Sequence, residues 1–215
     1  MGTDAAVRDD HFRFDGVDYF RGHAAAVQLG DVGERRNPAG SHRHLEVLAA
    51  LPRETLPIDR VTRIDLHGVT VRGGDIAADV TVAEVGLLGA STVARQLRDK
   101  TLCMVKVEAS AGALIAAAND CPDVLATLRR AGTAGRLVHQ VFVILEMGTA
   151  HDLAQATRWS VSGADRDFVL TGIAADGRRS AVTLGSGATF AYLLLNPTGL
   201  GKRIAGATSD IWSPP

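Results

Sequence analysis

Histidines and strand-end carboxylates are the residues of this sequence with the clearest chemical potential. His42 and His44 alternate as two metal ligands on one strand face would, but no HExxH motif or carboxylate cluster accompanies them. His139 lies in a strongly apolar strand pattern, which predicts an interior histidine with a hydrogen-bond partner. Glu108 and Glu146 each end a strand pattern, a position that suits a general acid or a surface cap. Because no nucleophile, base and orienting group can be assembled from these residues, we expect a protein that is not an enzyme and uses no metal or cofactor.

Three glycine-rich segments resemble catalytic or phosphate-binding loops only in part. GLGKR at 199–203 has Asn196 where a phosphate-binding loop needs glycine, and neither Ser nor Thr follows Lys202. GLLGAST and GSGAT lack the GxSxG spacing of a nucleophile elbow. We therefore discard a phosphate loop at 199–203 and interpret the other two segments as tight turns or close-packed backbone.

Composition restricts the class of protein further. The chain has 215 residues, 46% of them hydrophobic, and a net charge of −1. No apolar run approaches the ~20 residues of a membrane-spanning helix, and the near-zero charge argues against a nucleic-acid partner. The N-terminus lacks the basic and apolar regions of a secretory signal, so we expect a cytoplasmic protein. Cys103 and Cys121 have no CxxC spacing and are expected to be small buried hydrophobic residues.

The order of predicted elements indicates an α+β fold, with a twisted mixed or antiparallel central sheet and helices packed around it. Residues 136–148 are apolar on both faces, which predicts a strand in the middle of the sheet. Residues 101–109 predict another strand, and two helices that end at Gly132 follow it. Residues 157–173 predict a hairpin, and residues 188–196 predict the last strand.

Other stretches carry weaker or mixed patterns. The first forty residues have few periodic apolar positions and are predicted to be irregular. Residues 44–51 predict a short helix that Pro52 ends. Residues 75–97 begin with the alternation of a strand and continue with the spacing of a helix. The helical positions are Leu87, Ala90, Ala94 and Leu97.

Several segments occur in an order known from one protein family. They are a short helix before Leu56-Pro57, the alternating DIAADVTV, the junction GLLGAST, the strand TLCMVKV, the helix DVLATLRR and the strand QVFVILEM. In layout and apolar spacing, over about residues 45 to 195, this order resembles the pore-forming domain of the gasdermin family in its compact bacterial form. Bacterial members typically carry a lipid-modified cysteine near the start, whereas the first cysteine here is Cys103.

The resemblance implies an antiviral or cell-death protein that forms membrane pores after proteolytic activation. It divides the chain into a pore-forming domain at 1–197 and an autoinhibitory tail at 198–215. The implied cleavage region is Gly201, Lys202 and Arg203, and the implied apolar anchors of the tail are Ile204, Ile211 and Trp212. The implied partners are an activating protease, membrane lipids and further copies of the chain, which would move from the cytoplasm to the inner membrane on activation.

Insertion into a membrane requires segments that leave the soluble fold and extend into hairpins with fully paired strands. One candidate hairpin joins 75–83 with 101–107, the other joins 136–147 with 157–173, and both lack proline. Their candidate membrane residues are Val80, Val82, Val105, Val141, Val143, Val161 and Val169. The candidate lipid-binding residues are the paired arginines Arg129, Arg130, Arg178 and Arg179.

Two other hypotheses account for the same patterns. A soluble, non-enzymatic α+β binding or assembly module would use the two-faced strand simply as its core. A small hydrolase that depends on His67 or His139 is the third hypothesis.

Overall fold

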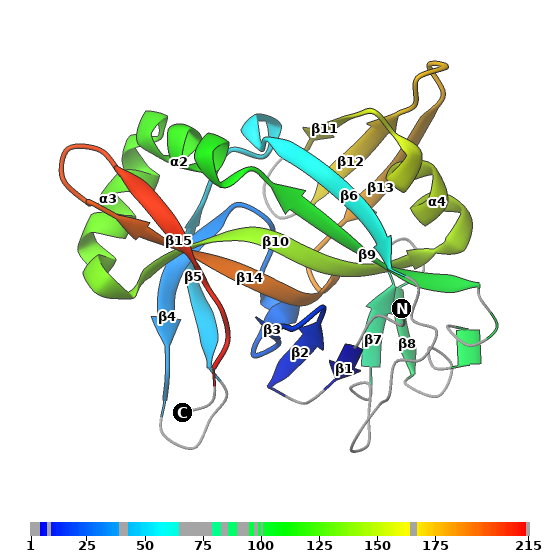
Figure 1. Cartoon of the computed structure of the whole chain (residues 1–215), viewed down its shortest axis with the longest axis horizontal. Helices are drawn as coiled ribbons and strands as arrows, with labels where there is room; N and C mark the ends of the chain where they lie inside the picture. The colour runs from blue at the N-terminus through cyan, green and yellow to red at the C-terminus, as the bar shows by residue number, and fades with distance from the viewer. Residues whose placement is uncertain are drawn as a thin grey trace.

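The structure is a computed structural model of the whole chain. It describes residues 5–7, 10–38, 43–64, 79–82, 86–89, 95–96, 99, 101–163 and 167–213. Antiparallel strands dominate it, and helices lie beside the sheet (Figure 1), so the predicted α+β class is confirmed.

One long strand, β10 (Gly135–Glu146), forms the centre of the main sheet. It pairs with β14 (Thr189–Thr198) on one side and with β4 (Asp31–Arg36) and β9 (Leu102–Ala109) on the other. Apolar side chains cover both of its faces, so it can lie only where other elements cover both sides. The predicted central strand is therefore confirmed.

On each side of the β10–β14 pair, the main sheet continues as two separate branches. At one end of β10 the sheet continues through β4 to β5 (His44–Ala50), and at the other end through β9 to β6 (Ile58–Ile64). Beyond β14, the final strand β15 (Gly206–Asp210) pairs with residues 194–198, and β3 (Val17–Phe20) pairs at Tyr192. β2 (His11–Phe14) and β1 (Ala5–Val7) follow β3. The first and last segments of the chain therefore lie on the same side of β14.

Two hydrophobic clusters cover the opposite faces of this sheet. The larger one packs between the sheet and the helices α2 (Ala111–Asp120), α3 (Pro122–Ala131) and α4 (Met147–Gln155). The smaller one is aromatic, and in it the Phe142 ring meets the rings of Phe12 and Tyr19 edge-on at 5.1 and 4.6 Å. α2 and α3 form the predicted helical pair, with Pro122 at the start of α3 and Gly132 at its end.

A second, smaller sheet carries the predicted hairpin. β11 (Arg158–Ser162), β12 (Phe168–Ile173) and β13 (Arg179–Leu184) pair in order, antiparallel throughout. The turn between β12 and β13 is closed by a hydrogen bond from the Ala174 amide to the Arg178 carbonyl. A further short hairpin joins β7 (Asp79–Val82) and β8 (Gly86–Gly89).

Four predictions about local structure were wrong. The first forty residues are not irregular, because β1 to β4 lie within them. Residues 44–50 form strand β5 and not a helix, since pairing with β4 outweighs the local spacing of their apolar residues. Residues 86–89 of the predicted helix are strand β8; residues 95–96 are helical, and 90–94 and 97 lie outside the described residues. β14 is not the last strand, because β15 joins the same sheet within the segment separated as a tail at 198–215.

Candidate functional site

The C-terminal segment combines an exposed loop with a docked strand. β14 ends at Thr198, and the chain returns through residues 199–205 so that β15 pairs antiparallel with β14 from Thr198 opposite Gly206 to Leu194 opposite Asp210. Gly199 allows the reversal, because its φ of +66° is a conformation that favours glycine. An added Cβ there would also lie 2.7 Å from the Ala205 Cβ. The loop is therefore a tight connection between two paired strands of one sheet.

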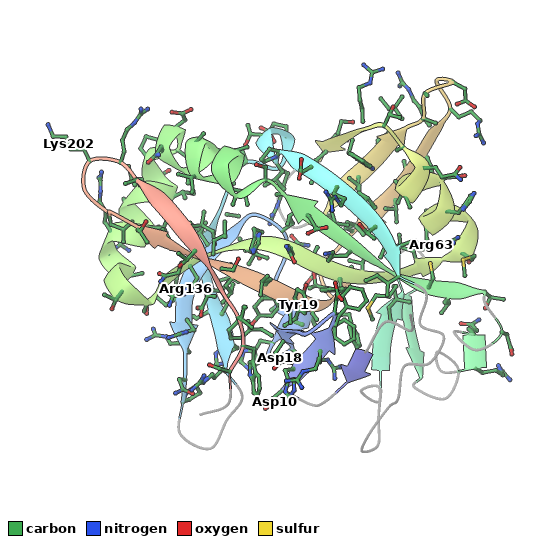
Figure 2. The ribbon with its side chains drawn as sticks, in the orientation of Figure 1. Asp10, Asp18, Tyr19, Arg63, Arg136 and Lys202 are labelled. Atoms are coloured by element: carbon green, nitrogen blue, oxygen red, sulfur yellow. The ribbon has the colours of Figure 1, made fainter. Side chains whose placement is uncertain are left out.

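The expected cleavage region lies at the tip of this loop. Gly201, Lys202 and Arg203 are all exposed, and Figure 2 shows Lys202 at the outer end of the loop, away from the body of the protein. Arg129 of α3 donates hydrogen bonds to the carbonyls of Gly201 and Lys202 at 2.9 and 2.5 Å. The side chains of the dibasic pair are therefore accessible, while Arg129 holds the backbone of Gly201 and Lys202.

Two of the three expected apolar anchors are buried. Ile204 lies in the larger hydrophobic cluster, and the Asn119 side chain fixes its backbone by accepting from its amide at 2.7 Å and donating to its carbonyl at 3.1 Å. Trp212 is also buried, and its ring stacks on the His11 ring with centroids 3.9 Å apart. The Trp212 amide donates to the Asp18 carbonyl, which ties the end of the chain to β3. Ile211 is 47% exposed and so is not a buried anchor.

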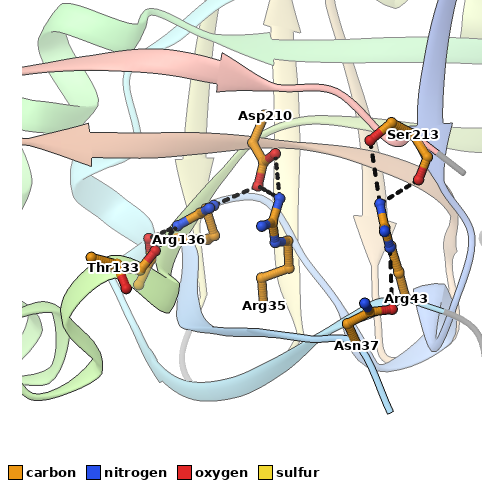
Figure 3. Close-up of polar contacts among 8 residues, drawn as sticks. Arg35, Asn37, Arg43, Thr133, Arg136, Asp210 and Ser213 are labelled. Atoms are coloured by element: carbon orange, nitrogen blue, oxygen red, sulfur yellow. Dashed lines mark hydrogen bonds and ion pairs between the residues drawn. The ribbon is translucent and has the colours of Figure 1, made fainter. Parts of the chain in front are cut away.

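Charged side chains also dock the C-terminal segment on the rest of the protein (Figure 3). The Asp210 carboxylate accepts from Arg35 at 2.8 Å and from Arg136 at 2.5 Å. Arg136 is only 4% exposed and also donates to the carbonyls of Thr133 and Gly135. Arg43 donates to the backbone carbonyl of Ser213. Since an uncompensated charge in such a site is costly, Asp210 couples the position of β15 to the stability of the body.

The paired arginines do not form one basic surface. Arg129 and Arg130 lie at the end of α3, whereas Arg178 and Arg179 lie at the start of β13, at the opposite side of the molecule (Figure 1). Arg178 donates to Asp176 at 2.8 Å, and Arg129 is engaged with the 199–203 loop. The candidate lipid-binding residues are thus two separate pairs.

The segments considered as membrane hairpins are not paired as hairpins in this state. In the first candidate, β7 pairs with β8, whereas β9 pairs with β10 and β6. In the second, β10 belongs to the main sheet, whereas β11 and β12 belong to the smaller one. Val105, Val141, Val143 and Val161 are buried, and Val169 is half-buried. Val80 and Val82 lie in β7, but their side chains lie outside the described residues.

The remaining sequence candidates are dispersed. His139 is buried at a bulge between β10 and β14, but its Nε2 has no hydrogen-bond partner among the described residues, so the predicted partner is absent. Burial, reinforced by the charge of Lys106, lowers the pKa of His139 to about 4. Glu108 pairs across the strands with Gln140 and lies 3.2 Å from Lys106, whereas Glu146 is exposed at a strand end. No side chain that could act as a nucleophile is hydrogen-bonded to His139 in the described part of the chain.

His44 lies in β5 with its ring centroid 3.9 Å from that of His23. His42 and His67 lie outside the described residues. Within the described ranges, no three His, Cys, Asp or Glu side chains are grouped to hold a metal ion, and no helix is long and apolar enough to cross a membrane.

The residues with the strongest docking geometry were not among the sequence candidates. Asp210 lies in a segment of small polar residues without a hydrophobic period, and its partner Arg136 lies 74 residues earlier. His11 and Asn119 likewise lack any local signal. The docked residues that were among the sequence candidates are the apolar anchors Ile204 and Trp212.

The sequence matches no protein-family model, and comparisons with curated proteins and with solved structures also find no match.

Proposed function

We propose that this protein permeabilises membranes and that its C-terminal segment keeps it inactive until a protease cuts the 199–203 loop. One observation carries the proposal. The dibasic pair Lys202-Arg203 is exposed at the tip of a loop, and the described segment that follows it, residues 204–213, is docked on the body through β15, Ile204 and Trp212. A cut at this position would leave β15, Ile204 and Trp212 as a separate peptide that can dissociate. The sequence resemblance to gasdermins is the basis for the proposed membrane activity, and the docked strand is the basis for its proposed control.

Dissociation of that peptide would alter the main sheet directly. β15 occupies the backbone edge of β14 at residues 194–198, so its loss would leave that edge unpaired. It would also leave Arg136, which is 4% exposed, without its carboxylate partner. Both effects favour rearrangement of the sheet or pairing with another copy. In this proposal the intact form is cytoplasmic and non-enzymatic, and the cut form assembles on the inner membrane.

Limited proteolysis combined with dye release tests the proposal. The purified chain is treated with trypsin under native conditions, the cut is mapped by mass spectrometry, and release from anionic liposomes is measured before and after. We expect an early cut at Lys202 or Arg203 and release only after it. Intact liposomes after a confirmed cut and dissociation of the peptide would contradict the proposal.

A matched pair of variants separates this cut from general proteolysis. Replacing Lys202 and Arg203 with Gln should abolish activation, because trypsin then has no site at the loop tip. Replacing Arg60 and Arg63, two exposed arginines of β6, should leave activation unchanged. Equal activation of both variants would show that the 199–203 loop is not the control point.

A soluble, non-enzymatic binding or assembly module is the second candidate function. The observation that favours it is the burial of Val141 and Val143 in the larger hydrophobic cluster, where both act as core residues of a central strand. This hypothesis predicts a stable homo-oligomer or a soluble complex in lipid-free buffer. Light scattering coupled to size-exclusion chromatography distinguishes it from the pore-former, which is expected to be a monomer before cleavage.

A further inference from the structure

A groove of about 790 Å³ lies beside the hairpin of β4 and β5, on strands that also contact the C-terminal segment. Its polar lining consists of His23, Arg35, Arg36, Asn37, His44 and Glu46. The volume falls in the range of small-molecule sites. Two guanidinium groups, two imidazoles and a side-chain amide around one space can donate hydrogen bonds to an anion, and guanidinium groups suit phosphate oxygens in particular.

Two side chains of the groove are held in place from within the core. The rings of His23 and His44 lie 3.9 Å apart, although they come from separate segments of the chain. The buried Tyr192 hydroxyl donates to the Gly22 carbonyl at 2.8 Å and accepts from the Leu45 amide at 2.9 Å, so it joins those two segments. His23 also has a φ of +55°, a conformation that a non-glycine residue adopts at some cost. Tyr192 thus fixes the backbone next to each of the two histidines that line the groove.

The charges of the groove are partly balanced by carboxylates. Arg36 donates to Glu46, which lines the groove, and lies 2.9 Å from Glu34. Its side chain is half exposed and its guanidinium carries five N–H donors, so it can contact a ligand without leaving these carboxylates. Arg35 contacts both oxygens of Asp210, at 2.8 and 3.1 Å. Both contacts come from Nη1 alone, so an anion that draws the Arg35 guanidinium into the groove would weaken its contact with the residue that docks β15.

We infer that this groove binds a small phosphate-bearing ligand, and that binding loosens the C-terminal strand because the ligand competes with Asp210 for Arg35. Ligand binding does not depend on the proposed pore formation. Only the effect of a loosened β15 on membrane activity rests on the proposed function. A ligand carrying two or more negative charges satisfies the two guanidinium groups best, so inorganic pyrophosphate is the probe. A lipid headgroup is the other source of such a phosphate group, and vesicles containing phosphatidic acid are the probe for it.

Calorimetric titration of the intact chain tests the site. We expect pyrophosphate to bind, Arg36→Ala to weaken binding by roughly tenfold or more, and Arg13→Ala to leave it unchanged. Arg13 is the matched control because it is also a half-exposed arginine beside a carboxylate, outside the groove. Vesicle binding that Arg36→Ala alone removes, without binding of free pyrophosphate, would assign the phosphate to a lipid headgroup. Binding of neither probe, or equal loss in both variants, would overturn the inferred site.

Hydrogen exchange on the unmodified chain tests the coupling. Saturating pyrophosphate should accelerate exchange of the β15 amides at 206–210 that bond to β14, while the β12 amides stay unchanged. Because coupling between two sites is reciprocal, Asp210→Asn should bind pyrophosphate several-fold more tightly than the unmodified chain. Unchanged or slower exchange in β15 would overturn the coupling. The hydrogen-exchange and pyrophosphate measurements use uncut protein without membranes. Their failure is therefore distinct from a failure of cleavage to cause dye release.

Discussion

Arg136 and Asp210 form an ion pair with a 2.5 Å contact, between the start of the central strand and the end of the last one. Arg136 is almost fully buried and Asp210 is mostly buried, so neither charge is well solvated. Arg35 contacts the same carboxylate from β4. Three strands that are distant in sequence therefore depend on one side chain of the C-terminal segment.

Replacing Asp210 with Asn should loosen β15 and lower the free energy of unfolding. The substitution keeps the shape of the side chain but leaves the buried Arg136 charge without its partner, which costs roughly 2 to 5 kcal/mol. Chemical denaturation measures the loss, and hydrogen exchange locates it. The control is Asp176→Asn, which breaks an exposed pair with Arg178 and should leave stability within error of the unmodified chain. Equal effects of the two substitutions would show that Asp210 has no special role.

Replacing Trp212 with Ala should release the end of the chain. Trp212 is buried and stacks on His11, so the loss of its ring should cost roughly 3 kcal/mol. The neighbouring Ile211→Ala is the control, because that side chain is 47% exposed and should change stability by less than about 0.5 kcal/mol. Denaturation midpoints of the two variants measure the difference. If Trp212→Ala is as stable as Ile211→Ala, the stacked ring does not dock the segment.

The parts of the fold that were predictable are those where the local pattern allows one structure only. Residues 136–146 are apolar on both faces over a length that suits a strand, so β10 could be placed at the centre of the sheet. β5 was not predictable, since the spacing of its apolar residues also suits a helix and only pairing with β4 decides between them.

The docking site shows the same limit. Trp212 could be identified because an apolar ring in a polar, glycine-rich segment needs a partner. Asp210 could not, because its importance comes from Arg35 and Arg136, which are brought to it by sheet pairing between distant segments. Arg129 was predictable as a cation but not as the side chain that holds the 199–203 loop.

Stability should fall as the pH is lowered from 6.5 to 4 because of His139. Its pKa is about 4 in the fold and 6.5 in the unfolded chain. Above pH 6.5 the histidine is neutral in both states and contributes nothing to this dependence. Below that value the unfolded chain binds a proton that the folded protein does not, so folding becomes less favourable until about pH 4. The shift corresponds to roughly 3 kcal/mol over this window.

Denaturation at a series of pH values checks this dependence. His139→Gln should flatten the curve between pH 4 and 6.5, because the substituted side chain does not titrate. His151→Gln is the control, since His151 is exposed on α4. An unchanged curve for His139→Gln would contradict the burial of a neutral imidazole at this position.

Replacing Gly33 with Ala should disrupt the β4–β5 hairpin that carries the groove. A Cβ added at Gly33 would lie 1.9 Å from the Glu46 carbonyl oxygen, a backbone atom that cannot move away without shifting β5. Gly33 also adjoins the irregularity in the pairing of β4 with β5, next to Val32. We expect the free energy of unfolding to fall by roughly 1 to 3 kcal/mol or more.

Gly112→Ala is the control, and it should be neutral or stabilising by up to about 1 kcal/mol, because an added Cβ in α2 meets no atom within 4 Å. Thermal unfolding of the two variants measures the difference, and similar midpoints would show that β5 adjusts to the added methyl group and that the hairpin is not rigid.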